Sequence, residues 1–190
     1  MKTRSLPPWL ILVLLALSLG ACSSGTSSFV RDDVDASFVR RVAVLPFHNL
    51  SQDVHAATRL HSVFTTRLLR REVFEVVALG EVLGAMTRQR LTVDEVPSPE
   101  QLVALGKELQ VDAFFLGTVD DYGLERVSNQ RIYQVTATFT LVETQTGGVL
   151  WTAQVHHDGD SLGRKLFGGG SASQHEVTQT VVDRALGTLF

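Results

Sequence analysis

YQVTATFTL at residues 133–141 and VLWTAQVH at residues 149–156 are two stretches in which apolar and polar side chains largely alternate. A period of two is typical of β-strands that have one buried face and one solvent-facing face. The segment between them, TQTGG at residues 144–148, is rich in residues that favour turns. We therefore predict an antiparallel hairpin over residues 133–156 and take it as the starting point for the fold.

The polar face of this hairpin consists of threonine, glutamine and histidine side chains. We refer to it as the polar strip, and its members are Thr136, Thr138, Thr140, Thr152, Gln154 and His156. Such a flat polar face can be a simple solvated surface, or it can be a contact surface for another subunit. An exposed sheet edge would allow the same kind of contact through addition of a strand. Both interpretations stay open, and the second makes the strip the predicted partner-binding site.

The first half of the domain has the pattern of a β–α–β unit. VAVLPF at residues 42–47 is a nearly continuous apolar run, which suits a strand buried on both faces. Residues 51–71 carry apolar side chains at spacings of three and four, which predicts a helix. Residues 74–79 form a second short apolar run. The unit predicts two parallel strands joined by a right-handed crossover.

Two helices and one strand are predicted between this unit and the hairpin. Residues 79–90 form the first helix and residues 98–110 form the second. The second has a clear start, because Ser98 can cap the helix, Pro99 suits its first position and Gln101 can complete a capping box. Residues 113–119, AFFLGTV, form the third apolar strand.

A last amphipathic helix near the C-terminus, over residues 177–189, completes the order β-α-β-α-α-β-β-β-α. This order predicts an α/β fold of mixed (α+β) type. We expect a mixed sheet of about five strands, with helices packed on it, mainly on one face.

The N-terminus has the pattern of a secretory signal peptide over residues 1–21. Lys2 and Arg4 precede an apolar run that ends in small residues. The run has about 12 residues, whereas a helix that crosses a membrane needs roughly 20. We therefore predict a cleaved export signal rather than a membrane span.

The chain has a single cysteine, Cys22, directly after this segment. The sequence LGAC at residues 19–22 resembles the lipobox of bacterial lipoproteins. The resemblance implies cleavage before Cys22 and lipid attachment to its thiol, with ordinary cleavage and a free thiol as the alternative. Several acyl chains hold a protein firmly on a bilayer. Ser23, rather than aspartate, follows the cysteine, and for this family that implies the periplasmic face of the outer membrane.

Residues 22–37 are predicted to be the lipidated cysteine and a flexible tether, and residues 38–190 a single domain. The chain has 17 basic and 20 acidic residues, a formal net charge of −3. Such a mildly acidic chain with scattered basic residues does not have the charge of a nucleic-acid binder. We also expect no cofactor.

Three stretches, in order along the chain, resemble TolB amino-terminal-like domains. They are VAVLPFHNLS at residues 42–51, ELQVDAFFLGTV at residues 108–119 and VETQTGGVLW at residues 142–151. The same core occurs in exported lipoproteins of the CsgG and LpoB groups. The resemblance implies a non-enzymatic role through protein contacts, including self-association, and no catalytic site.

Within this resemblance, the most favoured function is an accessory subunit in envelope assembly, secretion or transport. CsgG-type proteins form pores with long membrane-inserting hairpins, and this chain lacks spare length for them. LpoB-type proteins stimulate a peptidoglycan synthase on a long tether. The tether predicted here has about 15 residues and reaches at most about 50 Å. A synthase activator of the LpoB type is therefore the alternative.

A metal-dependent periplasmic enzyme is the alternative from another class. His156 and His157 are followed by two aspartates, and His175 could supply a third ligand. Adjacent residues of a strand point to opposite faces, however, so both histidines cannot easily bind one ion. We predict no metal site.

Two further groups of polar residues each have more than one interpretation. Arg67, Arg70 and Arg71 lie near the end of the first predicted helix, where they form a solvated face or contact lipid headgroups or an acidic partner. His48 and Asn49 follow the first strand, where open α/β sheets often hold ligands. We interpret the pair first as a structural turn.

Replacement of the cysteine tests the predicted anchor. Cys22→Ser removes the only thiol, so lipid attachment should be abolished and the protein should be released from the membrane or stalled as a precursor. Labelling with radioactive palmitate and membrane fractionation measure both effects. Unchanged membrane attachment of the variant would contradict the lipid anchor.

Overall fold

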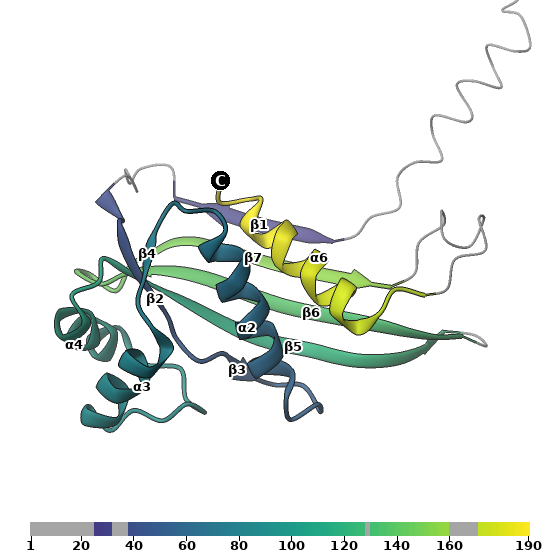
Figure 1. The fold of residues 1–190 in the computed structure, drawn as a ribbon, viewed down its shortest axis with the longest axis horizontal. Coiled ribbons are helices and arrows are strands. Elements are labelled where there is room, and N and C mark those ends of the chain that lie inside the picture. The colour runs from purple at the N-terminus through teal and green to yellow at the C-terminus, as the bar shows by residue number, and fades with distance from the viewer. Residues whose placement is uncertain (1–24, 32–37, 128–129, 160–170) are drawn as a thin grey trace, which may run out of the picture.

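The computed structural model describes residues 25–31, 38–127, 130–159 and 171–190 (Figure 1). The predicted signal peptide and Cys22 lie outside these residues. None of the helices in the described part of the chain is both long and apolar enough to cross a membrane.

The described chain forms one mixed seven-stranded sheet with four helices packed on it. The strands are β1 (Thr26–Val30), β2 (Arg41–Val44), β3 (His48–Asn49), β4 (Glu75–Val76), β5 (Ala113–Val127), β6 (Gln130–Glu143) and β7 (Val149–Asp158). The helices are α2 (Ala56–Leu69), α3 (Leu79–Arg88), α4 (Pro99–Leu109) and α6 (Gln174–Leu186). The strand order is β1-β7-β6-β5-β2-β4, and β3 pairs with β5. The predicted fold class and element order are confirmed, with β1 and β3 as additional strands.

The helices cover the two sheet faces unequally. Helices α2 and α6 pack together over the long strands on one face and bury the larger core. Helices α3 and α4 cover the other face only where β2 and the start of β5 lie, around Leu45 and Phe114. The expectation that helices lie mainly on one face is therefore wrong, because the crossovers before and after β4 run on opposite faces.

The larger core is built around aromatic rings from four elements. Phe64 of α2 stacks on Phe139 of β6, with ring centroids 5.1 Å apart. Phe47 meets both rings edge-on, at 5.5 and 5.8 Å. Phe115 of β5 contacts Phe64 and Trp151. Edge-to-face and stacked contacts of this kind add to the free energy gained from burying the rings.

The predicted hairpin is confirmed as β6 and β7, but its alternation breaks at one place. Val149 lies opposite Val142 and Trp151 lies opposite Leu141, so Leu150 is an extra residue on β7. This bulge turns both Leu150 and Trp151 into the larger core, where both are buried. Strict alternation would have put Leu150 on the polar face, and a bulge changes that register locally.

Residues Thr26–Val30 lie within the segment predicted to be a flexible tether, and they form a strand instead. β1 pairs antiparallel with β7, with Thr26 opposite Val155 and Val30 opposite Trp151. Threonine, phenylalanine and valine favour strands once a partner edge is present. The sheet therefore begins much closer to Cys22 than the sequence pattern indicates.

Helix α4 starts where the sequence predicts, whereas helix α2 does not. Ser98 caps α4 in a full capping box: its hydroxyl accepts from the backbone N–H of Gln101, whose side chain accepts from the backbone N–H of Ser98. Helix α2 begins later than predicted. The Asn49 side chain accepts from the Ser51 backbone and donates to the Asp53 carbonyl, which holds residues 50–53 in a turn.

Gly117 of β5 is a sensitive point of this core. A Cβ atom at this position would lie 2.6 Å from the Phe47 ring. We expect Gly117→Ala to lower the free energy of unfolding by about 1–3 kcal/mol, the usual range for overpacking. Gly123→Ala is the matched control in the same strand, because a Cβ there meets nothing within 4 Å. Chemical denaturation measures both, and equal stability of the two variants would contradict this account of the core.

Candidate functional site

The polar strip lies on the sheet face that α2 and α6 do not cover. Its residues form three facing pairs across β6 and β7: Thr136 with His156, Thr138 with Gln154, and Thr140 with Thr152. Their neighbours in sequence, such as Phe139 and Ala153, point the other way into the larger core. The structure therefore brings all six predicted residues together on one face.

Hydrogen bonds hold much of the strip flat against the sheet. The Thr136 hydroxyl and His156 Nδ1 are 2.9 Å apart. The Thr138 hydroxyl donates to the Asp120 carboxylate over 3.0 Å. The Thr152 hydroxyl donates to the carbonyl of Phe139 over 3.0 Å. These side chains present a pre-arranged polar surface rather than a set of mobile groups.

The strip continues in both directions across the sheet. In one row of facing residues, Gln154 lies opposite Ser27 of β1, and Thr138 lies opposite Thr118 of β5. Thr118 in turn pairs with His48 of β3. One polar row therefore runs from Ser27 of the edge strand β1 to His48 of β3.

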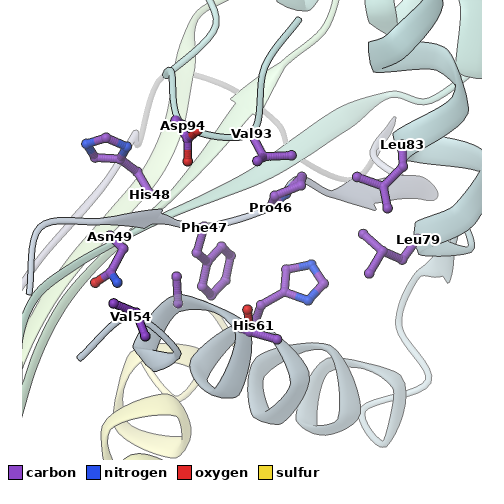
Figure 2. A pocket seen from close by; sticks show the side chains of 12 residues that line it. Pro46, Phe47, His48, Asn49, Val54, His61, Leu79, Leu83, Val93 and Asp94 are labelled. Atoms are coloured by element: carbon purple, nitrogen blue, oxygen red, sulfur yellow. The ribbon is translucent and has the colours of Figure 1, made fainter.

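A groove of about 540 Å³ begins where this row ends (Figure 2). Its lining is mainly apolar and comes from the segment after β2, from the start of α2, from α3 and from the loop that follows α3. The residues are Pro46, Phe47, His48, Asn49, Val54, Ala57, Thr58, His61, Leu79, Leu83, Val93 and Asp94. Figure 2 shows Phe47 and His61 in its middle, with Leu79 and Leu83 on one side. Its volume falls in the range of ligand and anchor-residue pockets.

The chain topology creates this groove. The connection after β2 forms α2 on one sheet face, and the connection after β4 forms α3 on the other face. A crevice therefore opens at the carboxyl end of β2, as it does at switch points of α/β sheets. Four apolar side chains are left exposed in it: Val54, Leu79, Leu83 and Val93.

His61 is a buried histidine in the floor of the groove. Its Nε2 lies 3.4 Å from the carbonyl oxygen of Val44, and its ring meets the Phe47 ring edge-on at 5.1 Å. Burial lowers the pKa of His61, and the contact with the Val44 carbonyl opposes this shift only in part. A neutral ring with the proton on Nε2, donated to Val44, fits this position.

His48 connects the groove with the polar strip. A second cavity, of about 110 Å³, is lined by His48 together with Thr138 and Thr140. The Nδ1 atom of His48 is buried and has no hydrogen-bond partner among the described residues. The neighbouring Asn49 is used in the turn before α2, as interpreted from the sequence, while His48 is half-buried between the two cavities. We refer to the polar strip and the groove together as the docking face.

The histidines considered for a metal site do not converge. His156 lies on the docking face beside Thr136, while His157 is paired with Val135, whose side chain points into the larger core. His175 lies on α6 beside Gln179. Within the described ranges, no group of three His, Cys, Asp or Glu side chains could hold a metal ion.

No family model matches the chain, and no curated protein matches it. Solved structures do. The PelC dodecamer from Paraburkholderia phytofirmans matches with a TM-score of 0.61 at 15% identity, covering 87% of this chain and 96% of that chain. The lipoprotein GNA1162 from Neisseria meningitidis gives 0.53 at 20% identity, covering 76% and 96%. The C-terminal domain of LpoB from Escherichia coli gives 0.50 at 14% identity, covering 65% and 87%.

These similarities show the fold. The chain has the fold found in the lipoprotein GNA1162 and in the C-terminal domain of LpoB, as the resemblance to the LpoB group predicts. The resemblance to TolB and CsgG domains stays a prediction. The groove was missed by the sequence analysis, although Leu79 and Leu83 stand four residues apart on one face of α3.

Protonation of His61 should destabilise the fold. Because burial lowers its pKa in the folded state, the unfolded chain binds this proton at higher pH. Stability is therefore complete above about pH 6.5, the unfolded value, and falls as the pH drops toward the lower folded value. We expect the urea midpoint to decrease between pH 7.5 and pH 5, and His61→Gln to reduce this decrease. His175→Gln removes an exposed histidine and should leave it unchanged; an equal effect of both variants would contradict the assignment.

Proposed function

We propose that this protein is a lipid-anchored accessory subunit of a cell-envelope complex. It acts in assembly, secretion or transport by binding a protein partner, and it performs no catalysis. The likeness to GNA1162 and LpoB supports an accessory role in the envelope. The docking face carries the proposal, because it joins a rigid polar surface to an exposed apolar groove.

The composition of the docking face is that of a protein interface. Exposed apolar clusters of this kind mark contact sites on soluble domains. In protein interfaces a few apolar anchor residues sit in pockets, and polar contacts around them exclude water. The groove offers the anchor pocket and the polar strip offers hydrogen bonds along one row. A partner that spans both would be fixed in position and register.

The proposed anchor is the lipid on Cys22, and it determines where the domain sits. Cys22 lies four residues before Thr26, the first residue of β1. Four residues reach at most about 14 Å when fully extended. The domain would therefore lie directly against the bilayer, which we take to be the periplasmic face of the outer membrane because Ser23 follows the cysteine.

An activator of a peptidoglycan synthase is the second candidate. The likeness to the C-terminal domain of LpoB favours it. The short connection between Cys22 and β1 disfavours it, since such an activator must reach far from its membrane. Self-association is compatible with either function. The likeness to a PelC dodecamer supports it, as does the outer edge of β1, which pairs with no other described strand. The metal-dependent enzyme is disfavoured, because the side chains of His156, His157 and His175 do not converge on one point.

Site-directed crosslinking in cells tests the docking face. We expect photo-crosslinking residues at Gln154, in the polar strip, and at Leu83, in the groove, to trap the same discrete partner protein. Ser62 is the matched control, because it is exposed on α2 over the opposite sheet face. Immunoblotting and mass spectrometry of the adducts identify the partner.

Two results would contradict the proposal. One is labelling from Ser62 that equals labelling from Gln154 and Leu83. The other is the absence of a discrete adduct from both docking-face positions. A dimer of this chain as the adduct would support self-association through this face.

A further inference from the structure

A cluster of arginines and exposed apolar side chains lies where α2 ends and the chain terminates. We call it the arginine patch and define it as Leu69, Arg70, Arg71, Val73 and Phe190. Leu69, Val73 and Phe190 are 52%, 53% and 45% exposed, which is high for large apolar side chains. Both arginines are exposed as well. The docking face does not include any of these residues.

Contacts with the Phe190 ring and within the backbone fix the arrangement of the patch. The guanidinium of Arg71 lies 5.5 Å from the centroid of the Phe190 ring. Phe190 also packs on the half-buried Phe74, with ring centroids 5.8 Å apart. The helix end is closed by a backbone bond from Arg71 to Leu68, and Glu72 turns the chain with a φ of 54°. Residues 69–73, which lead into this turn and out of it, are all exposed.

The charge of the patch is available to a ligand. Arg67, one turn earlier on α2, is partly buried and forms an ion pair with Asp183 over 3.4 Å. Arg70 and Arg71 form no ion pair with any of the residues that the structure describes. Residues 69–73 contain two arginines and one carboxylate, that of Glu72, so this turn has a net charge of +1; the α-carboxylate of Phe190, the last residue of the sequence, lies next to it.

The patch lies on the same side of the molecule as β1, near the Val30 end of that strand, because Trp151, which is opposite Val30, donates to Thr188 close to the C-terminus. Helix α6, which leads to Phe190, packs against both α2 and β1. In Figure 1 the C-terminus, the end of α2 and β1 lie along the same upper side of the molecule. The chain before β1 contains Cys22, four residues from Thr26. A lipid on that residue would hold this side of the domain at the membrane.

We propose that the arginine patch binds the anionic headgroups of the membrane to which Cys22 is attached. This inference rests on the proposed lipid anchor for its biological setting, but the surface itself consists of described residues. The guanidinium groups of Arg70 and Arg71 donate to lipid phosphates, and Leu69, Val73 and Phe190 enter the interfacial region. Two signals, a lipid and a basic patch, together give a stable and oriented attachment.

The orientation has a consequence for the docking face. In Figure 1, β3 and α3 lie on the side of the molecule opposite to β1 and the C-terminus. These elements carry the groove. With the patch on the membrane, the groove faces away from the bilayer, toward a partner in the surrounding compartment.

Vesicle binding of the chain without a lipid tests the patch separately from the anchor. The chain from Ser23 to Phe190 contains every described residue and lacks Cys22. We expect it to co-sediment with vesicles of phosphatidylcholine and phosphatidylglycerol, and much less with phosphatidylcholine alone. Binding should be lost in high salt, because screening weakens contacts with charged headgroups.

Matched variants assign the binding to the patch. Each arginine near an anionic surface contributes about a factor of five, so R70Q/R71Q should bind about 30-fold more weakly. R67Q also removes an arginine from α2, but one that is paired with Asp183, and it should bind as the wild type does. Equal loss in both variants, or equal binding to both kinds of vesicle, would overturn the proposal. No binding to anionic vesicles would overturn it in favour of an acidic protein partner.

A second measurement uses the attached protein. The chain from Cys22 to Phe190 is linked through its thiol to maleimide lipids in nanodiscs that contain phosphatidylglycerol and a spin-labelled lipid. The amide signals of residues 69–73 and 190 should broaden, and those of residues 79–94 should not. Broadening at residues 79–94 instead would overturn the proposal. Failure of the Cys22→Ser test, in contrast, would refute the natural anchor and leave this membrane surface intact.

Discussion

The stacking of Phe64 on Phe139 is the contact on which the rest of the structure depends. It joins α2 to the middle of β6, and the rings of Phe47, from the segment after β2, and of Phe115, from β5, complete the cluster. Because one sheet face takes up nearly all the large aromatic side chains, the other face is left with threonine and glutamine over most of its length. The uncovered docking face is therefore a direct result of how the core is filled.

The parts of the fold that could be predicted are those with a local pattern. Residues 133–141 alternate strictly, so the hairpin and its polar strip follow from sequence alone. Ser98, Pro99 and Gln101 lie within four residues of one another, and their capping box is as predicted. The polar strip was predicted as a set of residues, because strand alternation places side chains two apart on one face.

The parts that could not be predicted depend on residues distant in sequence. Thr26–Val30 form a strand only because the edge of β7 is available, and an isolated segment of five such residues has no stable structure of its own. The groove brings together Val54 from the turn before α2, Leu79 of α3 and Val93 from the loop after α3, and no spacing rule connects them. The bulge at Leu150 could not be predicted either. It lets Trp151 be buried in the larger core, and no local sequence preference indicates it.

The pairing of β1 also sets an order of events during folding. Thr26 pairs with Val155, so the first strand of the sheet has its partner near the other end of the chain. If the chain is exported N-terminus first, as its proposed function requires, β1 emerges long before β7. Contacts so distant in sequence form late, after local ones such as the β6–β7 hairpin. On the proposed export route, β1 would therefore pair with β7 only when most of the chain has crossed the membrane, and this pairing would complete the sheet.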